Sequence, residues 1–181
     1  MYLDEAVTTI TQFDTPIAWM YLDKNGKVCV GTHHRLIDVH MAQELPFHRW
    51  TAAEATREEI AQEYDRIKQQ RPGFTPSAYH RSDSLLLPKA AMMKVLRETL
   101  VRCAVMLSAS FPDYDVYPDT IKVALLDMCY DVSLPYLSSR LCEAVGKQNW
   151  ALASTLCRRD DASSERNNWT RRQFVDVAVE V

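Results

Sequence analysis

The sequence predicts an α+β fold that is mostly α. The chain has 181 residues, of which 47% are hydrophobic and 25% charged, and this is enough apolar material for one good core. It contains only four glycines but eight prolines, a balance that favours helices over a loop-rich or all-β protein. Short extended runs rich in aromatic and β-branched residues occur near the N-terminus. We therefore expect a single domain of helices with one small antiparallel sheet.

The N-terminal segment predicts a helix followed by a β-hairpin. Apolar residues lie at helical spacing over residues 3–13, so this helix should end at Asp14. The runs IAWMYL and KVCVG predict two strands, and the turn sequence Asp-Lys-Asn-Gly separates them. Asp23 then lies at the turn and Cys29 on the returning strand. The hairpin should bring these two residues and Asp14 near one another.

The chain after the hairpin predicts a connector and a capped helix. Residues 36–47 form a short helical or irregular connector that is closed by a proline. Thr51 followed by Glu54 predicts a capping box, and this helix should continue to about Gln70. Two prolines and a glycine make residues 72–87 the clearest break in the chain.

Helices should fill the rest of the chain. Pro88 suits the first turn of a helix over residues 88–108, which is apolar nearly all round and should be the most buried helix. Four more helices are predicted, at about residues 117–131, 135–146, 148–158 and 163–179. We expect one domain over residues 1–181, with a hairpin-containing lobe (1–50), a linking helix (51–71) and a larger helical lobe (72–181).

Charge and composition exclude several classes of function. The formal net charge of −3 creates no basic field, so we expect no nucleic-acid partner. No stretch approaches ~20 apolar residues, so no membrane insertion is predicted. The N-terminus MYLDEAV lacks a basic region before an apolar one, which predicts synthesis in the cytoplasm without a signal peptide. The five cysteines have no paired short spacing and are interpreted as buried free thiols.

Two carboxylates that share one site can hydrolyse a glycosidic bond. One carboxyl group acts as the acid, while the other stays ionised to handle water or the developing cation. Asp14 and Asp23 could form such a pair. An Asp at a helix end and an Asp in a turn are also ordinary structural placements.

Two other chemistries are weaker alternatives. Cys29 could act as a nucleophile with His33 or His34, but residues four apart on an extended strand are ~13 Å from each other. A metal site would need the four histidines between residues 33 and 48, and none of them has the helical i, i+4 spacing of a zinc site beside a carboxylate. We therefore expect no metal and no cofactor.

The order of these residues resembles the phage-type lysozymes of glycoside hydrolase family 24. In that family a Glu-Gly pair follows the first helix, and a Tyr-x-Asp turn with Gly precedes Thr-x-Gly-x-Gly-His. The matching residues here are Tyr21, Asp23, Gly26, Val30, Gly31 and His34.

Two later segments extend the resemblance over most of the chain. FPDYDVYPDTIKVALLDMCYDVS (residues 111–133) resembles the family's Phe-Pro-x-x-Asp…Ala-Leu-x-x-Met-x-Phe-x-x-Gly helix. GKQNWALAS and ERNNWTRRQF resemble its closing Trp-x-x-Ala-Ala and Arg-Asn-x-x-x-x-x-Phe segment. Arg166 matches the family arginine that reaches toward the acid, and Asp127 occupies a neighbouring polar position.

The departures from the family pattern fall at the site itself. The family's acid is Glu, which is Asp14 here, and the following Gly is Thr15. The family's Thr on the returning strand is Cys29, and its second Gly is His33. The family's Asn-x-Gly after the Met helix is residues 131–133, which end in Ser.

The resemblance implies a lysozyme-like fold, with a small hairpin lobe and a larger helical lobe around a cleft. It implies that Asp14 is the general acid, that Asp23 stays ionised beside the oxocarbenium ion, and that Cys29 takes the place of the family Thr beside the attacking water. It also implies a set of substrate-binding residues: Gly31, Thr32, His33, His34, Asp127 and Arg166.

The implied activity is cleavage of the β-1,4 bond between the amino sugars of peptidoglycan. A monomeric muramidase of this kind acts as a phage endolysin or as a secreted antibacterial toxin domain, and it reaches the cell wall by a route without a signal peptide. A toxin would also imply an immunity or inhibitor protein as partner. The alternative is a lysozyme scaffold that has lost catalysis and binds a glycan or a protein.

Overall fold

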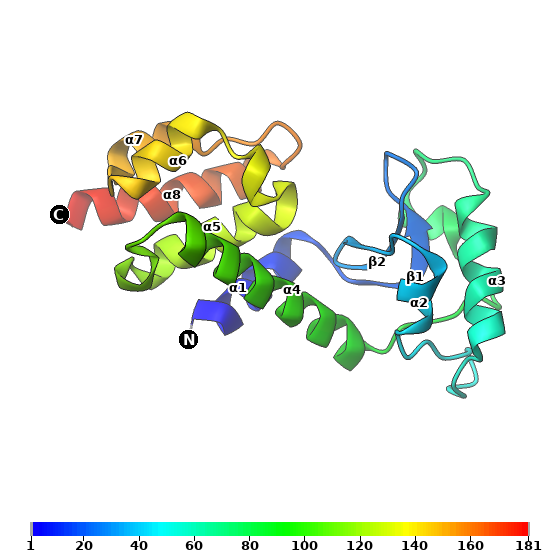
Figure 1. Ribbon diagram of the computed structural model, residues 1–181. Helices are drawn as coiled ribbons and strands as arrows, with labels where there is room; N and C mark the ends of the chain where they lie inside the picture. Colours follow the sequence, from blue (N-terminus) through cyan, green and yellow to red (C-terminus); the bar gives the residue numbers. More distant parts are fainter. Residues whose placement is uncertain (1, 181) are drawn as a thin grey trace. The chain divides into compact units, whose positions relative to one another are not determined.

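The computed structural model describes residues 2–180 and is α+β and mostly α (Figure 1). Within these residues, eight α-helices accompany one three-stranded antiparallel sheet. This is the class that the sequence predicts, and it is consistent with a lysozyme-like fold. The chain divides into two compact units: the sheet unit, Asp14–Leu96, and the helical unit, Met1–Phe13 with Arg97–Val181.

The sheet is built on the predicted hairpin. Its strands lie in the order β1 (Ile17–Leu22), β2 (Val28–Gly31) and β3 (His34–Arg35). Cys29 is in the central strand, where it pairs with Tyr21 on one side and with Arg35 on the other. The register shifts between Ile17 and Tyr21, and such a bulge bends the strand that carries it.

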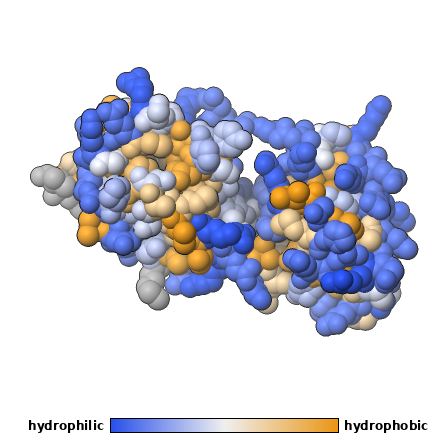
Figure 2. Space-filling view, in the orientation of Figure 1, coloured by the Kyte–Doolittle hydropathy of each residue, from blue (hydrophilic) through white to orange (hydrophobic). Residues whose placement is uncertain are grey.

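Within this unit, α3 (Arg57–Lys68) packs against β1 and β2, and α2 (Val39–Gln43) packs against α3. Ile60, Tyr64 and Ile67 recur at helical spacing and are buried, so α3 packs one apolar stripe into the core. The opposite face of α3 is hydrophilic and lies at the right edge of Figure 2.

The start of α3 differs from the sequence prediction, which placed the cap at Thr51. The N-cap is Thr56, whose side chain accepts a hydrogen bond from the Glu59 amide, while the Glu59 side chain accepts one from the Thr56 amide. Both Thr-x-x-Glu pairs have the spacing of a capping box. The first pair is not used because His48 forms β-bridges to Glu54 and to Leu86, which hold this segment out of a helix.

The segment over residues 72–87 is attached to the sheet. The Trp19 indole donates a hydrogen bond to the Pro76 carbonyl over 2.8 Å, and the Leu87 amide donates one to the Ala18 carbonyl over 2.7 Å. His80 also packs against the Trp19 ring. The predicted break in helical structure is therefore correct, but the segment is fixed to β1.

The helical unit is organised around α5 (Asp119–Val132), in which every residue from Ile121 to Cys129 is buried. α5 packs against α1 and α8, and α7 packs against α6 and α8. These helices are α1 (Tyr2–Phe13), α6 (Ser139–Gly146), α7 (Trp150–Leu156) and α8 (Ser164–Glu180).

The prediction that the helix over residues 88–108 would be the most buried is wrong. This helix, α4 (Lys89–Ser110), buries the stripe Met92, Leu96, Leu100, Cys103 and Leu107. Its other apolar side chains include Val105, which is 65% exposed. Apolar residues all round a helix do not reveal which faces have neighbours, and α5 has neighbours on more faces than α4.

No helix within residues 2–180 is both long and apolar enough to cross a membrane.

Candidate functional site

The Asp23 carboxylate is anchored by backbone amides of its own turn and by an ion pair. Asp23 directly follows β1, and its Oδ1 accepts hydrogen bonds from the Asn25 amide at 2.8 Å and the Lys27 amide at 2.9 Å. Its Oδ2 lies 3.3 Å from Nε of Arg35. The Asp23 side chain is only 8% exposed, so two amide donors and one ion pair leave this carboxylate little freedom to turn.

Cys29 lies beside this carboxylate, in agreement with the predicted hairpin. Burial, together with the negative charge of Asp23, raises the pKa of the Cys29 thiol to about 12. The thiol is therefore protonated at neutral pH, and the residue is fully buried. Both facts disfavour a nucleophilic thiolate at Cys29. The implied role of Cys29 beside an attacking water stays a prediction.

The tight turn between β2 and β3 contains three of the predicted substrate-binding residues. Gly31 has φ 65° and His33 has φ 64°, both in the left-handed region, and Thr32 between them is buried. His34 follows in β3 and pairs with Val30. The exposed His33 has its ring 5.8 Å from that of Tyr21, in an edge-on arrangement.

Asp14 lies where the sequence predicts, between the end of α1 at Phe13 and the start of β1 at Ile17. It is partly exposed. Because Ile17 pairs with Gly31, the chain that leaves Asp14 enters the sheet at the Gly31 end, whereas Asp23 is at the turn end. The convergence of the two carboxyl groups stays a prediction, and it depends on the bend at the bulge in β1.

Asp127 and Arg166 are brought together in the helical unit. Arg166 Nη2 lies 2.6 Å from Asp127 Oδ1, and Arg159 Nη2 lies 2.8 Å from Asp127 Oδ2. Arg159 also pairs with Asp131 at 3.0 Å and donates to Thr170 at 2.9 Å. We call these residues the Asp127 network.

The Asp127 network is internal. Asp127 is 0% exposed and forms ion pairs with two arginines. The substrate-binding role that the resemblance implies for Asp127 stays a prediction. Arg166 is buried as well, and its guanidinium lies over the Phe13 ring, 5.6 Å from the centroid. This ring contact joins α8 to α1.

Sequence reasoning missed two charged members of these clusters. Arg35 was not singled out, although its place opposite Cys29 could have been found by counting the register from the turn. Arg159 is one of two adjacent arginines between α7 and α8, and no local pattern indicates which of them is buried.

The described residues contain no cluster of three or more His, Cys, Asp or Glu side chains arranged to hold a metal ion. All five cysteines are free thiols.

A comparison with protein-family models finds no match for this chain, and no curated protein matches its sequence.

Proposed function

We propose that this protein is a glycoside hydrolase that cleaves β-1,4 bonds between the amino sugars of peptidoglycan. Asp14 acts as general acid on the leaving oxygen, and Asp23 is the ionised carboxylate that stabilises the oxocarbenium ion or positions water. The three-block resemblance to phage-type lysozymes motivates this assignment.

The observation that carries the proposal is the anchored carboxylate of Asp23. A group that stabilises a developing cation must keep a defined position, because preorganised charge costs no reorganisation during the reaction. Two backbone amides and Arg35 hold Asp23 in this way. Arg35 adds a positively charged partner to the two backbone bonds that an aspartate in a turn can form.

The backbone supports the resemblance at two positions far apart in the sequence. His33 and Ser133 both stand where the family pattern has glycine, and both have positive φ, 64° and 65°. Residues other than glycine rarely adopt this conformation. The chain thus has, at these two positions, the positive φ that a glycine in the family pattern would allow. One of the two positions lies in each unit.

A binding protein on the same scaffold is the second candidate, and the state of Cys29 favours it. The family Thr supplies a hydroxyl, whereas Cys29 has a buried, protonated thiol, which is a weaker hydrogen-bond partner. Asp14 is also one methylene shorter than Glu, and a misplacement of ~1 Å can cost ~10²-fold in rate.

The release of reducing ends from purified peptidoglycan tests the two candidates. If the protein is a hydrolase, wild type releases reducing ends, and Asp14→Asn and Asp23→Asn abolish this release. Asp14→Glu reduces the release, because the site is built for the shorter acid. For the binding protein, wild type is inactive and sediments with peptidoglycan. Asp14→Glu, combined with Cys29→Thr, then restores some turnover.

Asp65→Asn is the matched control, since Asp65 is an exposed carboxylate on α3 in the same unit. This variant should retain wild-type activity and binding. Equal background release by wild type, Asp14→Asn and Asp23→Asn would refute the hydrolase.

A further inference from the structure

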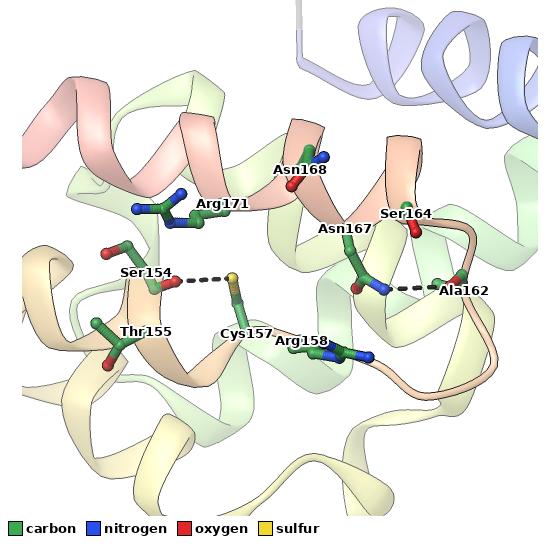
Figure 3. A pocket seen from close by; sticks show the side chains of 9 residues that line it. All are labelled: Ser154, Thr155, Cys157, Arg158, Ala162, Ser164, Asn167, Asn168 and Arg171. Carbon is green, nitrogen blue, oxygen red and sulfur yellow. Dashed lines mark hydrogen bonds between the residues drawn. The ribbon is translucent and has the colours of Figure 1, made fainter.

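A separate pocket lies in the helical unit, between the C-terminal end of α7, the loop over residues 157–163 and the first turns of α8 (Figure 3). Its volume is about 430 Å³, within the range of small-molecule sites, ~300–1,000 Å³. The lining residues are Ser154, Thr155, Cys157, Arg158, Ala162, Ser164, Asn167, Asn168 and Arg171. None of them belongs to the proposed hydrolase site.

The wall of this pocket is held in place by Asn167. Its Oδ1 accepts a hydrogen bond from the Arg159 amide at 2.9 Å, and its Nδ2 donates to the carbonyls of Arg159 at 2.8 Å and Ala162 at 3.2 Å. Both ends of the side-chain amide are therefore used to fix the loop against α8. The pocket is preformed, so a ligand would not have to order this loop on binding.

The charge of the lining is entirely positive. The pocket has two arginines and no acidic residue. Among the side chains described, over residues 2–179, neither Arg158 nor Arg171 forms an ion pair, and the Asn168 amide and Ser164 hydroxyl have no hydrogen-bond partner. These four residues are exposed, so their donors are available to an anionic ligand in the pocket.

The two guanidinium groups reach different parts of the pocket. In Figure 3, Arg171 extends toward Ser154, while Arg158 extends toward the loop that ends at Ala162. Burial raises the pKa of the Cys157 thiol at the pocket wall, and the positive charges of Arg159 and Arg171 offset part of this shift. A single small anion would engage one of these groups and leave the other unused.

We propose that this pocket binds a small organic molecule with two phosphate groups, one held by Arg171 and the other by Arg158. The planar guanidinium matches the geometry of phosphate oxygens, and each pair gains from charge-assisted hydrogen bonds. The amide of Asn168 and the hydroxyl of Ser164 supply further contacts near α8. The uncharged part of the ligand lies over Ala162 and Cys157.

Isothermal titration of the full chain with fructose 1,6-bisphosphate, an organic molecule with two separated phosphate groups, tests this site. Fructose 6-phosphate is the comparison and sodium chloride at equal ionic strength is the blank. The bisphosphate should bind more tightly than the monophosphate. Arg171→Ala and Arg158→Ala should each weaken binding of the bisphosphate at least ~10-fold, as expected for the loss of one charge-assisted contact. Circular dichroism should show both variants folded, because both side chains are exposed.

Arg172→Ala is the matched control, because Arg172 is the exposed neighbour of Arg171 on α8 and does not line the pocket. It removes the same charge and should leave the affinity unchanged. The proposal is overturned if fructose 1,6-bisphosphate does not bind, if it binds no more tightly than fructose 6-phosphate, or if Arg172→Ala weakens binding as much as Arg171→Ala. Peptidoglycan hydrolysis should not change in Arg171→Ala, so this test is independent of the hydrolase assignment.

Discussion

Replacement of Asp127 by Asn should strongly destabilise the helical unit. The carboxylate is fully buried and forms ion pairs at 2.6 Å and 2.8 Å with two arginines that are themselves 6% and 3% exposed. Loss of one partner of a buried ion pair costs about 3–5 kcal/mol, because an uncompensated charge stays behind. Asp131 remains 3.0 Å from Arg159 and offsets part of this charge, so we expect the lower end, about 3 kcal/mol.

Urea unfolding followed by circular dichroism measures this effect. With a slope of about 2 kcal/mol/M, a loss of 3 kcal/mol lowers the midpoint by about 1.5 M. Hydrogen exchange of peptides from α5 and α8 locates the change, and peptides from the sheet unit serve as an internal reference.

Asp176→Asn is the control, since it removes an exposed carboxylate from the same helix α8. It should change the free energy of unfolding by no more than about 0.5 kcal/mol. If the midpoint of Asp127→Asn falls by no more than that of Asp176→Asn, the stabilising role assigned to the network is refuted.

Two further predictions concern the backbone and pH. His33→Gly and Ser133→Gly should each raise the free energy of unfolding by about 0.5–1 kcal/mol, because glycine accepts positive φ without strain. Ser108→Gly, within α4, is the control and should lower the free energy of unfolding. Melting temperatures of His33→Gly and Ser133→Gly that both lie below that of wild type would contradict this prediction. The thiol of Cys29 ionises near pH 9 in the unfolded chain but at about 12 in the folded protein, so its contribution to stability is fully present below pH 9 and is lost as the pH rises toward 12. The free energy of unfolding of wild type should therefore fall relative to that of Cys29→Ser over this range. A difference between the two proteins that stays constant in urea melts from pH 8 to 11 would disprove the buried environment assigned to the Cys29 thiol.

Local patterns in the sequence determined the hairpin and the positions of most helices. Asp-Lys-Asn-Gly specifies a turn through its own hydrogen bonds, and the turn then sets the register that brings Cys29 beside Asp23. Helical periodicity located α1 and α5 to within a few residues because each signal lies inside one element. These features depend on residues a few positions apart, which a single sequence displays directly.

Tertiary structure decided which of several equivalent local signals is used. Thr51 and Thr56 both begin a capping-box sequence, and the bridge from His48 to the distant Leu86 selects the second. Arg166 contacts Asp127 across 39 residues of sequence, and Arg159 rather than its neighbour completes that network. Burial and ion pairing depend on which surfaces meet in space. The apolar content of α4 therefore could not show how much of the helix surface would be buried. The physical reason is that sequence periodicity depends on one helix alone, whereas burial depends on the elements that pack against it.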